Sequence, residues 1–254
     1  MNVSLGELEK KRQDIENLID ITFFIPCLNE EYSIIATLDK LVAVAEELKL
    51  TFELLIYNDG STDHTKMLVE NYAKEHQGLF LRLINNEKRK GLGYNYIDGA
   101  FVGFGKYYMM VCGDNSETAD SLREIIQRRG TADIVIPYFG ELDTRNVFRR
   151  NLSKLFTFIV NSIGGHHIKY YNGTVLHERF NIMRWHPSSS GFAYQAEMLV
   201  IMLGERKTYC EVQVANRDRE KGISRAFHLQ NIFSVTHSLF QILCRRIRRE
   251  IWPL

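Results

Sequence analysis

The stretches ITFFIPCLNEE (residues 21–31) and FELLIYNDGSTD (residues 52–63) share one order of features: an apolar run, then small and polar residues. Both runs are apolar on two faces, as strands of a parallel sheet covered by helices on each side must be. A stretch of helical period follows each one. The pair therefore predicts βαβ units with right-handed crossovers, in which ligands bind at the carboxyl ends of the strands.

The same alternation continues to Phe139. Further apolar runs are Phe80–Ile84, Tyr107–Val111 and Ile134–Phe139, and the predicted helices are about Tyr32–Leu48, Thr65–Lys74, Tyr94–Gly103 and Ser121–Arg129. This pattern predicts an α/β fold, with an open, mostly parallel sheet that includes five parallel strands and has helices on both faces.

The alternation of apolar runs and helical stretches ends after Asp143. The expected elements are a long helix (Val147–Ile163), a stop at Gly164-Gly165, two short strand-like segments, a helix near Phe192–Leu203 and a strand at Thr208–Val214. Since no Pro- or Ser-rich linker separates the halves, one domain is expected over 21–228. A helical extension (1–20) and a C-terminal helix (229–254) flank it.

Composition limits the partners. Thirty-two Lys and Arg residues against 31 Asp and Glu give a net charge of +1, so no global footprint for nucleic acid exists and a small ligand is expected. The four cysteines show no C-x-x-C pair, which fits a reduced, cytoplasmic protein. No signal-peptide h-region and no spanning stretch of about 18 apolar residues is seen.

The C-terminal segment Leu229–Leu254 is amphipathic and ends in Arg245, Arg246, Arg248 and Arg249 beside Trp252. Such a helix suits the interface of an anionic membrane, at the inner face of which the protein would then be peripheral. Packing against the domain explains the pattern equally well, and the sequence leaves both alternatives open.

Carboxylates follow the first two strands. Asp59 and Glu30 can accept hydrogen bonds from a base N–H or a ribose hydroxyl. Helix capping is the alternative, with Ser61 or Thr62 as N-cap and Asp63 in the first turn. Capping leaves Asp59 and Glu30 without a structural task, so we expect these two to bind a ligand.

Two further strand ends point to a diphosphate. The basic loop Asn86–Gly93 can approach phosphate through backbone N–H groups and cationic side chains, but it lacks the third glycine of a dinucleotide fingerprint and the G-K-[ST] of a P-loop. Asp114 follows the fourth strand, where a carboxylate beside a basic loop suits a divalent cation, Mg²⁺ or Mn²⁺, that bridges a diphosphate. A turn or cap residue is the alternative for Asp114.

The order of these motifs resembles that of the inverting family 2 glycosyltransferases: first Pro26…Asn29-Glu30, then Asp59–Asp63, the glycine loop and Asp114. Three segments of the second half resemble segments of the polyprenyl-phosphate glycosyltransferases, namely Gly191–Glu197, Glu211-Val212 and Arg219–Arg225. The resemblance spans about Ile21 to His228. It implies a Rossmann-like GT-A fold and transfer of a hexose from a UDP- or GDP-sugar to a polyprenyl phosphate or glycan.

The resemblance also implies roles for matching residues. The nucleoside would contact Pro26, Glu30 and Asp59, a metal would bind Asp114, and Gln195 and Glu197 would face the sugar or acceptor. The predicted catalytic residues are Asp114, Gln195, Glu197 and Arg219, and the predicted substrate-binding residues are Pro26, Asn29, Glu30, Asp59, Ser61, Lys90, Gly91, Ser224 and Arg225. A hydroxyl acceptor needs a base, for which Glu197 is the candidate, whereas a lipid phosphate is already anionic and needs none.

The segment around Gly222 is strongly basic, with Arg217, Arg219, Lys221 and Arg225. This composition suits a flexible lid that neutralises a diphosphate or an acceptor phosphate. The alternative is that these arginines are exposed and only solvated.

Two departures from the family pattern keep other functions open. Cys112 stands where the family's D-x-D usually has a carboxylate, and Asn58 replaces the first aspartate of a D-D pair, so a degenerate nucleotide-binding or scaffold protein is an alternative. A sugar nucleotidyltransferase is a second alternative. Such enzymes need a glycine-rich basic signature at the first strand, where this chain has Pro26-Cys27-Leu28-Asn29.

Overall fold

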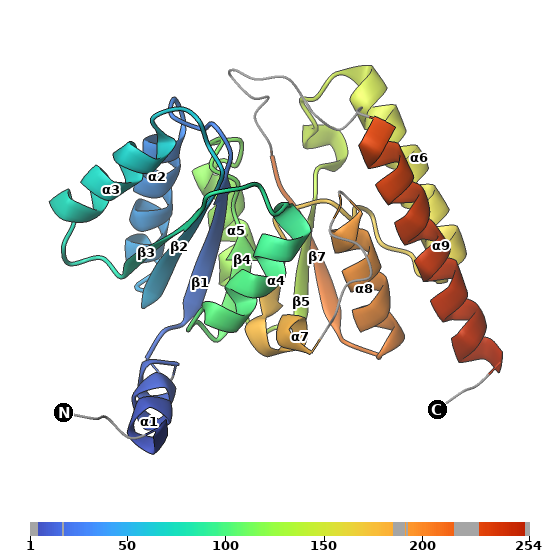
Figure 1. Cartoon of the computed structure of the whole chain (residues 1–254). Coiled ribbons are helices and arrows are strands. Elements are labelled where there is room, and N and C mark those ends of the chain that lie inside the picture. Colours follow the sequence, from blue (N-terminus) through green and yellow to red (C-terminus); the bar gives the residue numbers. More distant parts are fainter. Residues whose placement is uncertain (1–4, 17, 185–190, 192, 216–228, 252–254) are drawn as a thin grey trace.

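A seven-stranded β-sheet forms the centre of the molecule, with helices on both faces (Figure 1). The computed structural model describes residues 5–16, 18–184, 191, 193–215 and 229–251. Within them the strands are β1 (Ile21–Cys27), β2 (Phe52–Asp59), β3 (Leu81–Asn86), β4 (Tyr107–Met110), β5 (Ile134–Tyr138), β6 (Leu176–Glu178) and β7 (Tyr209–Gln213).

The strand order is β3-β2-β1-β4-β6-β5-β7, and only β6 runs antiparallel to its neighbours. This confirms the predicted α/β fold with an open, mostly parallel sheet. The sequence pattern does not reveal that β5 is separated from β4 by β6. Leu176 of β6 lies opposite Met109 on one side and Val135 on the other. A strand of three residues is too short to show a period, so its place in the sheet is set by tertiary pairing.

The two faces of the sheet carry separate cores. Side chains of successive strand residues point to opposite faces, so Phe23 and Ile25 belong to the core cluster that includes residues of α2, α3 and α5, while Phe24 belongs to the cluster that includes residues of α4, α6, α7, α8 and α9. The helices are α1 (Leu5–Glu16), α2 (Ile34–Glu47), α3 (Thr65–Glu75), α4 (Leu92–Val102), α5 (Ala119–Gln127), α6 (Val147–Gly164), α7 (Arg179–Met183), α8 (Tyr194–Gly204) and α9 (Leu229–Ile251), with a 3-10 turn at Gly140–Leu142.

The last helix packs onto the domain. α9 lies beside α6 (Figure 1) and contacts both α6 and α8. Gly165 ends α6 at the predicted stop, with the left-handed φ of 73° that glycine adopts readily. Among the helices of the described residues, none has the length and apolar character needed to span a bilayer.

Candidate functional site

The carboxyl ends of β1, β2, β3 and β4 meet at one edge of the sheet, on the side away from α1 (Figure 1). Because the four strands are parallel, the loops that follow them converge. The last residues of β1 and β2 include Pro26 and Asp59, and the loops carry Asn29, Glu30, Ser61, Lys90, Gly91 and Asp114. The structure thus brings together the residues predicted from the first half of the chain.

Hydrogen bonds join the loops after β1 and β2. The Asn29 N–H donates to Ser61 Oγ at 2.9 Å, and Asn29 Oδ1 accepts from the Thr62 N–H at 2.8 Å. The Glu30 N–H donates to Thr65 Oγ1 at 2.9 Å. These bonds fix both backbones, and Asn29 tolerates the positive φ of 61° that its place in the turn requires.

The predicted N-cap at Ser61 or Thr62 is wrong. α3 begins at Thr65, and Ser61 is occupied by the loop after β1. Asp63 precedes the helix instead of lying in its first turn: its Oδ1 accepts from the Thr65 N–H at 3.0 Å, while its Oδ2 accepts from the Glu31 N–H at 3.1 Å. The helix starts later because these side chains satisfy backbone groups of the neighbouring loop.

Asp59 has a structural task that the sequence does not reveal. Its nearly buried carboxylate accepts from the Lys90 N–H at 2.8 Å, from the Gly91 N–H at 3.0 Å and from Asn86 Nδ2 at 3.1 Å. Burial alone would raise the pKa of Asp59, but the hydrogen bonds that its carboxylate accepts, with the one from the Lys90 N–H first among them, together outweigh burial and hold the pKa below its ordinary value. Asp59 therefore fixes the glycine loop against β2.

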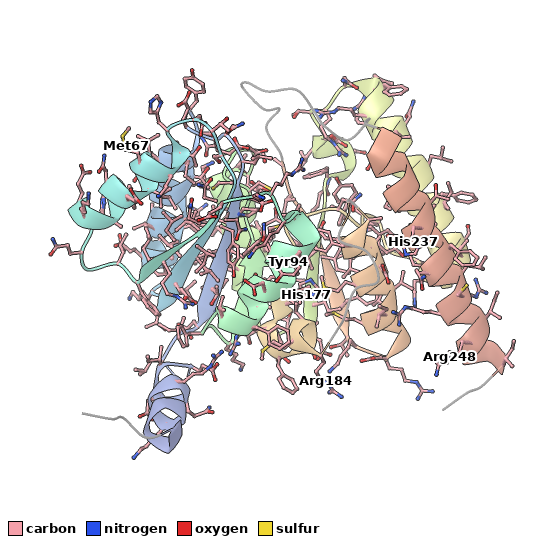
Figure 2. The ribbon with its side chains drawn as sticks, in the orientation of Figure 1. Met67, Tyr94, His177, Arg184, His237 and Arg248 are labelled. Carbon is pink, nitrogen blue, oxygen red and sulfur yellow. The ribbon has the colours of Figure 1, made fainter. Side chains whose placement is uncertain are left out.

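The glycine loop turns sharply into α4. Gly91 has a φ of 98°, which favours glycine. Its N–H and that of Lys90 contact Asp59, so in this structure these two groups do not face outward to a phosphate. The exposed Lys90 ammonium lies 5.5 Å from the ring centroid of Tyr94, on the first turn of α4 (Figure 2). The Lys90 side chain is thus an accessible cation of the loop, as are the exposed Lys88 and Arg89.

Three carboxylates surround the buried thiol of Cys27. Burial raises the pKa of Cys27, and the negative charges of Glu30, Asp114 and Asp63 raise it further. The Gly113 N–H donates to the Pro26 carbonyl at 3.2 Å, which draws the loop after β4 against the end of β1. A Cβ at Gly113 would lie 2.8 Å from Cys27 Sγ. The close approach of the two loops places Asp114 in the same site as Glu30.

Glu117 is a site residue that the sequence reasoning missed. Ser116 Oγ lies 2.8 Å from Asp114 Oδ1 and 3.2 Å from Glu117 Oε2, and its single proton can serve only one carboxylate at a time. Burial and the nearby Asp114 charge raise the pKa of Glu117, although Thr174 donates to it at 2.7 Å. The available signal was a second carboxylate three positions after Asp114.

This carboxylate pair suits a divalent cation. Among the described residues, no group of three His, Cys, Asp or Glu side chains could hold a metal alone. Magnesium-like ions need only one or two carboxylates when phosphate oxygens and water supply the other ligands. Asp114 and Glu117 therefore fit an ion that binds together with a nucleotide diphosphate.

Cys112 packs away from this pair. It contacts the core cluster that includes Tyr194 and Met110, whereas Cys27, which adjoins Asp114, belongs to the cluster on the opposite face. The residue at the first D-x-D position thus packs against the cluster on the Tyr194 face of the sheet, and Glu117 provides the second carboxylate near Asp114.

In the second half of the chain, Gln195 and Glu197 lie on α8 and are buried. Gln195 Nε2 donates to the Gly173 carbonyl at 3.2 Å. Glu197 has 0% exposure, and its Oε1 lies 3.8 Å from Arg245 Nη2 of α9. No local pattern links Glu197 to Arg245, so the sequence could not predict this pair. Arg219, Ser224 and Arg225 lie outside the described residues.

Comparison with known proteins agrees with this fold. Residues 22–186 match the family model described as glycosyl transferase family 2. A dolichyl-phosphate beta-glucosyltransferase of Trichomonas vaginalis is 34% identical over 109 residues, which are 41% of this chain and 32% of the relative. A second one, of Dictyostelium discoideum, is 28% identical over 114 residues, 43% of this chain and 35% of the relative. The matches span about a third of these relatives.

Solved structures show the same fold over nearly the whole chain. Glucosyl-3-phosphoglycerate synthase from Mycobacterium tuberculosis, in complex with Mn²⁺, uridine diphosphate and phosphoglyceric acid, superposes with a TM-score of 0.65. The superposition covers 97% of this chain and 83% of the synthase at 14% sequence identity. This supports the GT-A fold.

Proposed function

The chain belongs to glycosyl transferase family 2, and on this basis we propose that it transfers a hexose from a UDP-sugar to a polyprenyl phosphate, with inversion at the anomeric carbon. Two matched relatives are dolichyl-phosphate beta-glucosyltransferases, and the structurally similar synthase is seen with uridine diphosphate. Glucose is therefore the first sugar to test. A soluble glycan acceptor and a GDP-sugar donor are the competing assignments.

The burial of Glu197 is the observation from which we infer the class of acceptor. A hydroxyl acceptor must lose a proton to a base, and a base must be within hydrogen-bond reach of that proton. Glu197, the candidate base, is fully buried and paired with Arg245. A lipid phosphate is already anionic and can attack without a base. The burial of Glu197 thus favours a phosphate acceptor over a hydroxyl acceptor.

The remaining roles follow from the site geometry. Glu30, with Pro26 and Asn29, lines the nucleoside side of the edge, where Asp59 fixes the adjoining glycine loop. Asp114 and Glu117 would hold the cation, whose charge stabilises the departing diphosphate. The exposed Lys90 adds a positive charge on the diphosphate side. Arg219, Ser224 and Arg225 remain proposed contacts of the acceptor phosphate.

A transfer assay tests this function. The full chain is incubated with Mn²⁺ and radiolabelled UDP-glucose, UDP-N-acetylglucosamine or GDP-mannose, each with a polyprenyl phosphate, 3-phosphoglycerate or a soluble glucan. We expect labelled polyprenyl phosphate from a UDP-sugar. Label in the glucan would reassign the acceptor, and nucleotide binding without transfer to any acceptor would indicate a degenerate protein. Pyrophosphate release from UTP and a sugar phosphate would indicate a nucleotidyltransferase.

Asp114→Ala is the matching site variant. We expect the transfer rate to fall about a hundredfold or more, because charge stabilisation of the leaving group is lost, while the thermal unfolding midpoint stays near that of the parent. Asp120→Ala, at an exposed aspartate of α5, is the control. Parental transfer and parental Mn²⁺ binding by the Asp114 variant would refute the metal assignment.

A further inference from the structure

The outward sides of α6 and α9 are apolar. Val147, the first residue of α6, is exposed, and so are eight large apolar side chains further along the two helices: Phe148, Leu152, Leu155 and Phe158 on α6, and Phe240, Leu243, Ile247 and Ile251 on α9. Their spacing of three or four residues places each set on one side of its helix. We call these eight residues the α6–α9 face.

This face is not the one that packs on the protein. α6 buries Thr157, Val160 and Gly164, and α9 buries Ser238 and Ile242. Phe158 and Phe240 remain 69% and 60% exposed. A helix that only covers a core needs one apolar side, so core packing among the described residues does not account for this second apolar side.

The two helices present this face together. They lie side by side at one edge of the molecule (Figure 1), and Arg246 Nη1 of α9 donates to the Ser162 carbonyl of α6 at 2.7 Å. α6 begins shortly after the carboxyl end of β5, so the face adjoins the edge of the sheet that carries the candidate site.

The charge around the face is strongly positive. α6 contains Arg149, Arg150 and Lys154 and no acidic residue, while α9 contains four arginines and one glutamate. The two helices thus contribute +6 to a chain whose total is +1, so the remainder carries −5. Arg245 and Arg246 are engaged with Glu197 and with α6, whereas Lys154 and Arg248 are exposed (Arg248 in Figure 2).

We propose that the α6–α9 face docks on the surface of an anionic lipid bilayer, with its apolar side chains in the interface and Lys154 and Arg248 near the headgroups. In a two-fold dimer through this face, the helices of each copy, with a net charge of +6, would lie against the same helices of the other copy. Repulsion between these like charges opposes self-association. An anionic bilayer matches both the apolar side chains and the charge. The proposal would place a lipid phosphate beside the site, but it rests on no step of the transfer reaction.

Vesicle binding without any sugar nucleotide tests the proposal. The full chain is sedimented with vesicles of phosphatidylglycerol and phosphatidylcholine, and separately with phosphatidylcholine alone, over a range of salt concentrations. We expect binding to the anionic vesicles that weakens as salt rises, because surface charge attraction is screened. The apolar variant is Phe158→Ser/Phe240→Ser. Its control is Met67→Ser/Phe180→Ser, at exposed apolar residues away from the face, with Met67 at the opposite edge (Figure 2).

The apolar variant should bind anionic vesicles about tenfold or more weakly, whereas the control should bind like the parent. Lys154→Gln/Arg248→Gln should lower the salt dependence, while Lys66→Gln/Lys74→Gln on α3 should leave it unchanged. Circular dichroism and ultracentrifugation accompany each variant. Equal binding by the parent and the apolar variant, or no binding by the parent, would overturn the proposal. A parental dimer that the apolar variant dissolves would show that a second copy covers the face.

Discussion

The two halves of the chain hold their site residues by different kinds of contact. The carboxyl end of β2 and the loops after β1, β2 and β3 are joined by hydrogen bonds among residues of short motifs, such as Asn29 with Ser61 and Asp59 with Lys90. On α8, Glu197 is held by Arg245 of the last helix. The first half of the site is therefore fixed by hydrogen bonds between neighbouring strand-end loops, and the second half depends on the docking of the last helix.

The strongest test of the first half is Asp59→Asn. The amide replaces a carboxylate that accepts three hydrogen bonds, and we expect a loss of about 2–3 kcal/mol in the free energy of unfolding at neutral pH, because bonds to charged acceptors are the costly ones to remove. Urea denaturation measures it, with Asp120→Asn as the control.

The pH dependence of this loss follows from the sign of the pKa shift. Folding lowers the pKa of Asp59, so its contribution is present above the ordinary carboxyl pKa and is lost as pH falls through the folded value. Parent and Asp59→Asn should thus converge in stability in acid. A difference that stays constant with pH would mean that the carboxylate charge does not hold the glycine loop.

Gly113→Ala tests how closely the loops after β1 and β4 approach. The new Cβ would lie 2.8 Å from Cys27 Sγ, with its next contacts at 3.4 Å, and we expect a loss of about 1–3 kcal/mol from this overpacking. Cys27→Ala removes the clashing atom. The double variant should therefore be more stable than the sum of the two single losses predicts. Strict additivity in a double-mutant cycle would show that the clash with Cys27 is not the cause of the loss.

Arg245→Gln tests the second half. It leaves Glu197 buried beside a neutral partner, but Arg245 is 44% exposed and its Nη2 lies 3.8 Å away, so solvent screening limits the expected loss to about 1 kcal/mol. Glu197→Gln combined with Arg245→Gln should recover part of it. If the double variant is no more stable than additivity predicts, the two side chains do not interact, and α9 is held by its other contacts.

The same contrast explains what could be predicted. The alternation of apolar runs and helical stretches predicts the sheet and gathers Glu30, Asp59 and Asp114 at one edge, because parallel strands end on the same side. The sequence could not show that Asp59 fixes the Lys90–Gly91 turn, since hydrogen bonds between loops depend on their three-dimensional approach. The place of the three-residue β6 and the Glu197–Arg245 pair were equally hidden, because tertiary contacts alone determine them.

The smallest expected effect concerns the boundary between the two halves. Cys112→Asp restores the carboxylate that the family's D-x-D usually has at this position, and on the family pattern alone it should tighten metal binding. In the structure Cys112 packs with the cluster of Tyr194 and Met110, while Asp114 adjoins Cys27 of the opposite cluster. A carboxylate at 112 would thus be partly desolvated, and we expect Mn²⁺ affinity in the presence of UDP to change less than about twofold, with a stability loss of about 1 kcal/mol.

Glu117→Gln, in contrast, should weaken Mn²⁺ binding about tenfold, because it removes the second oxygen ligand beside Asp114. Calorimetric titration of both variants decides between the arrangements: tighter binding by Cys112→Asp together with parental binding by Glu117→Gln would place the second ligand at the family position after all.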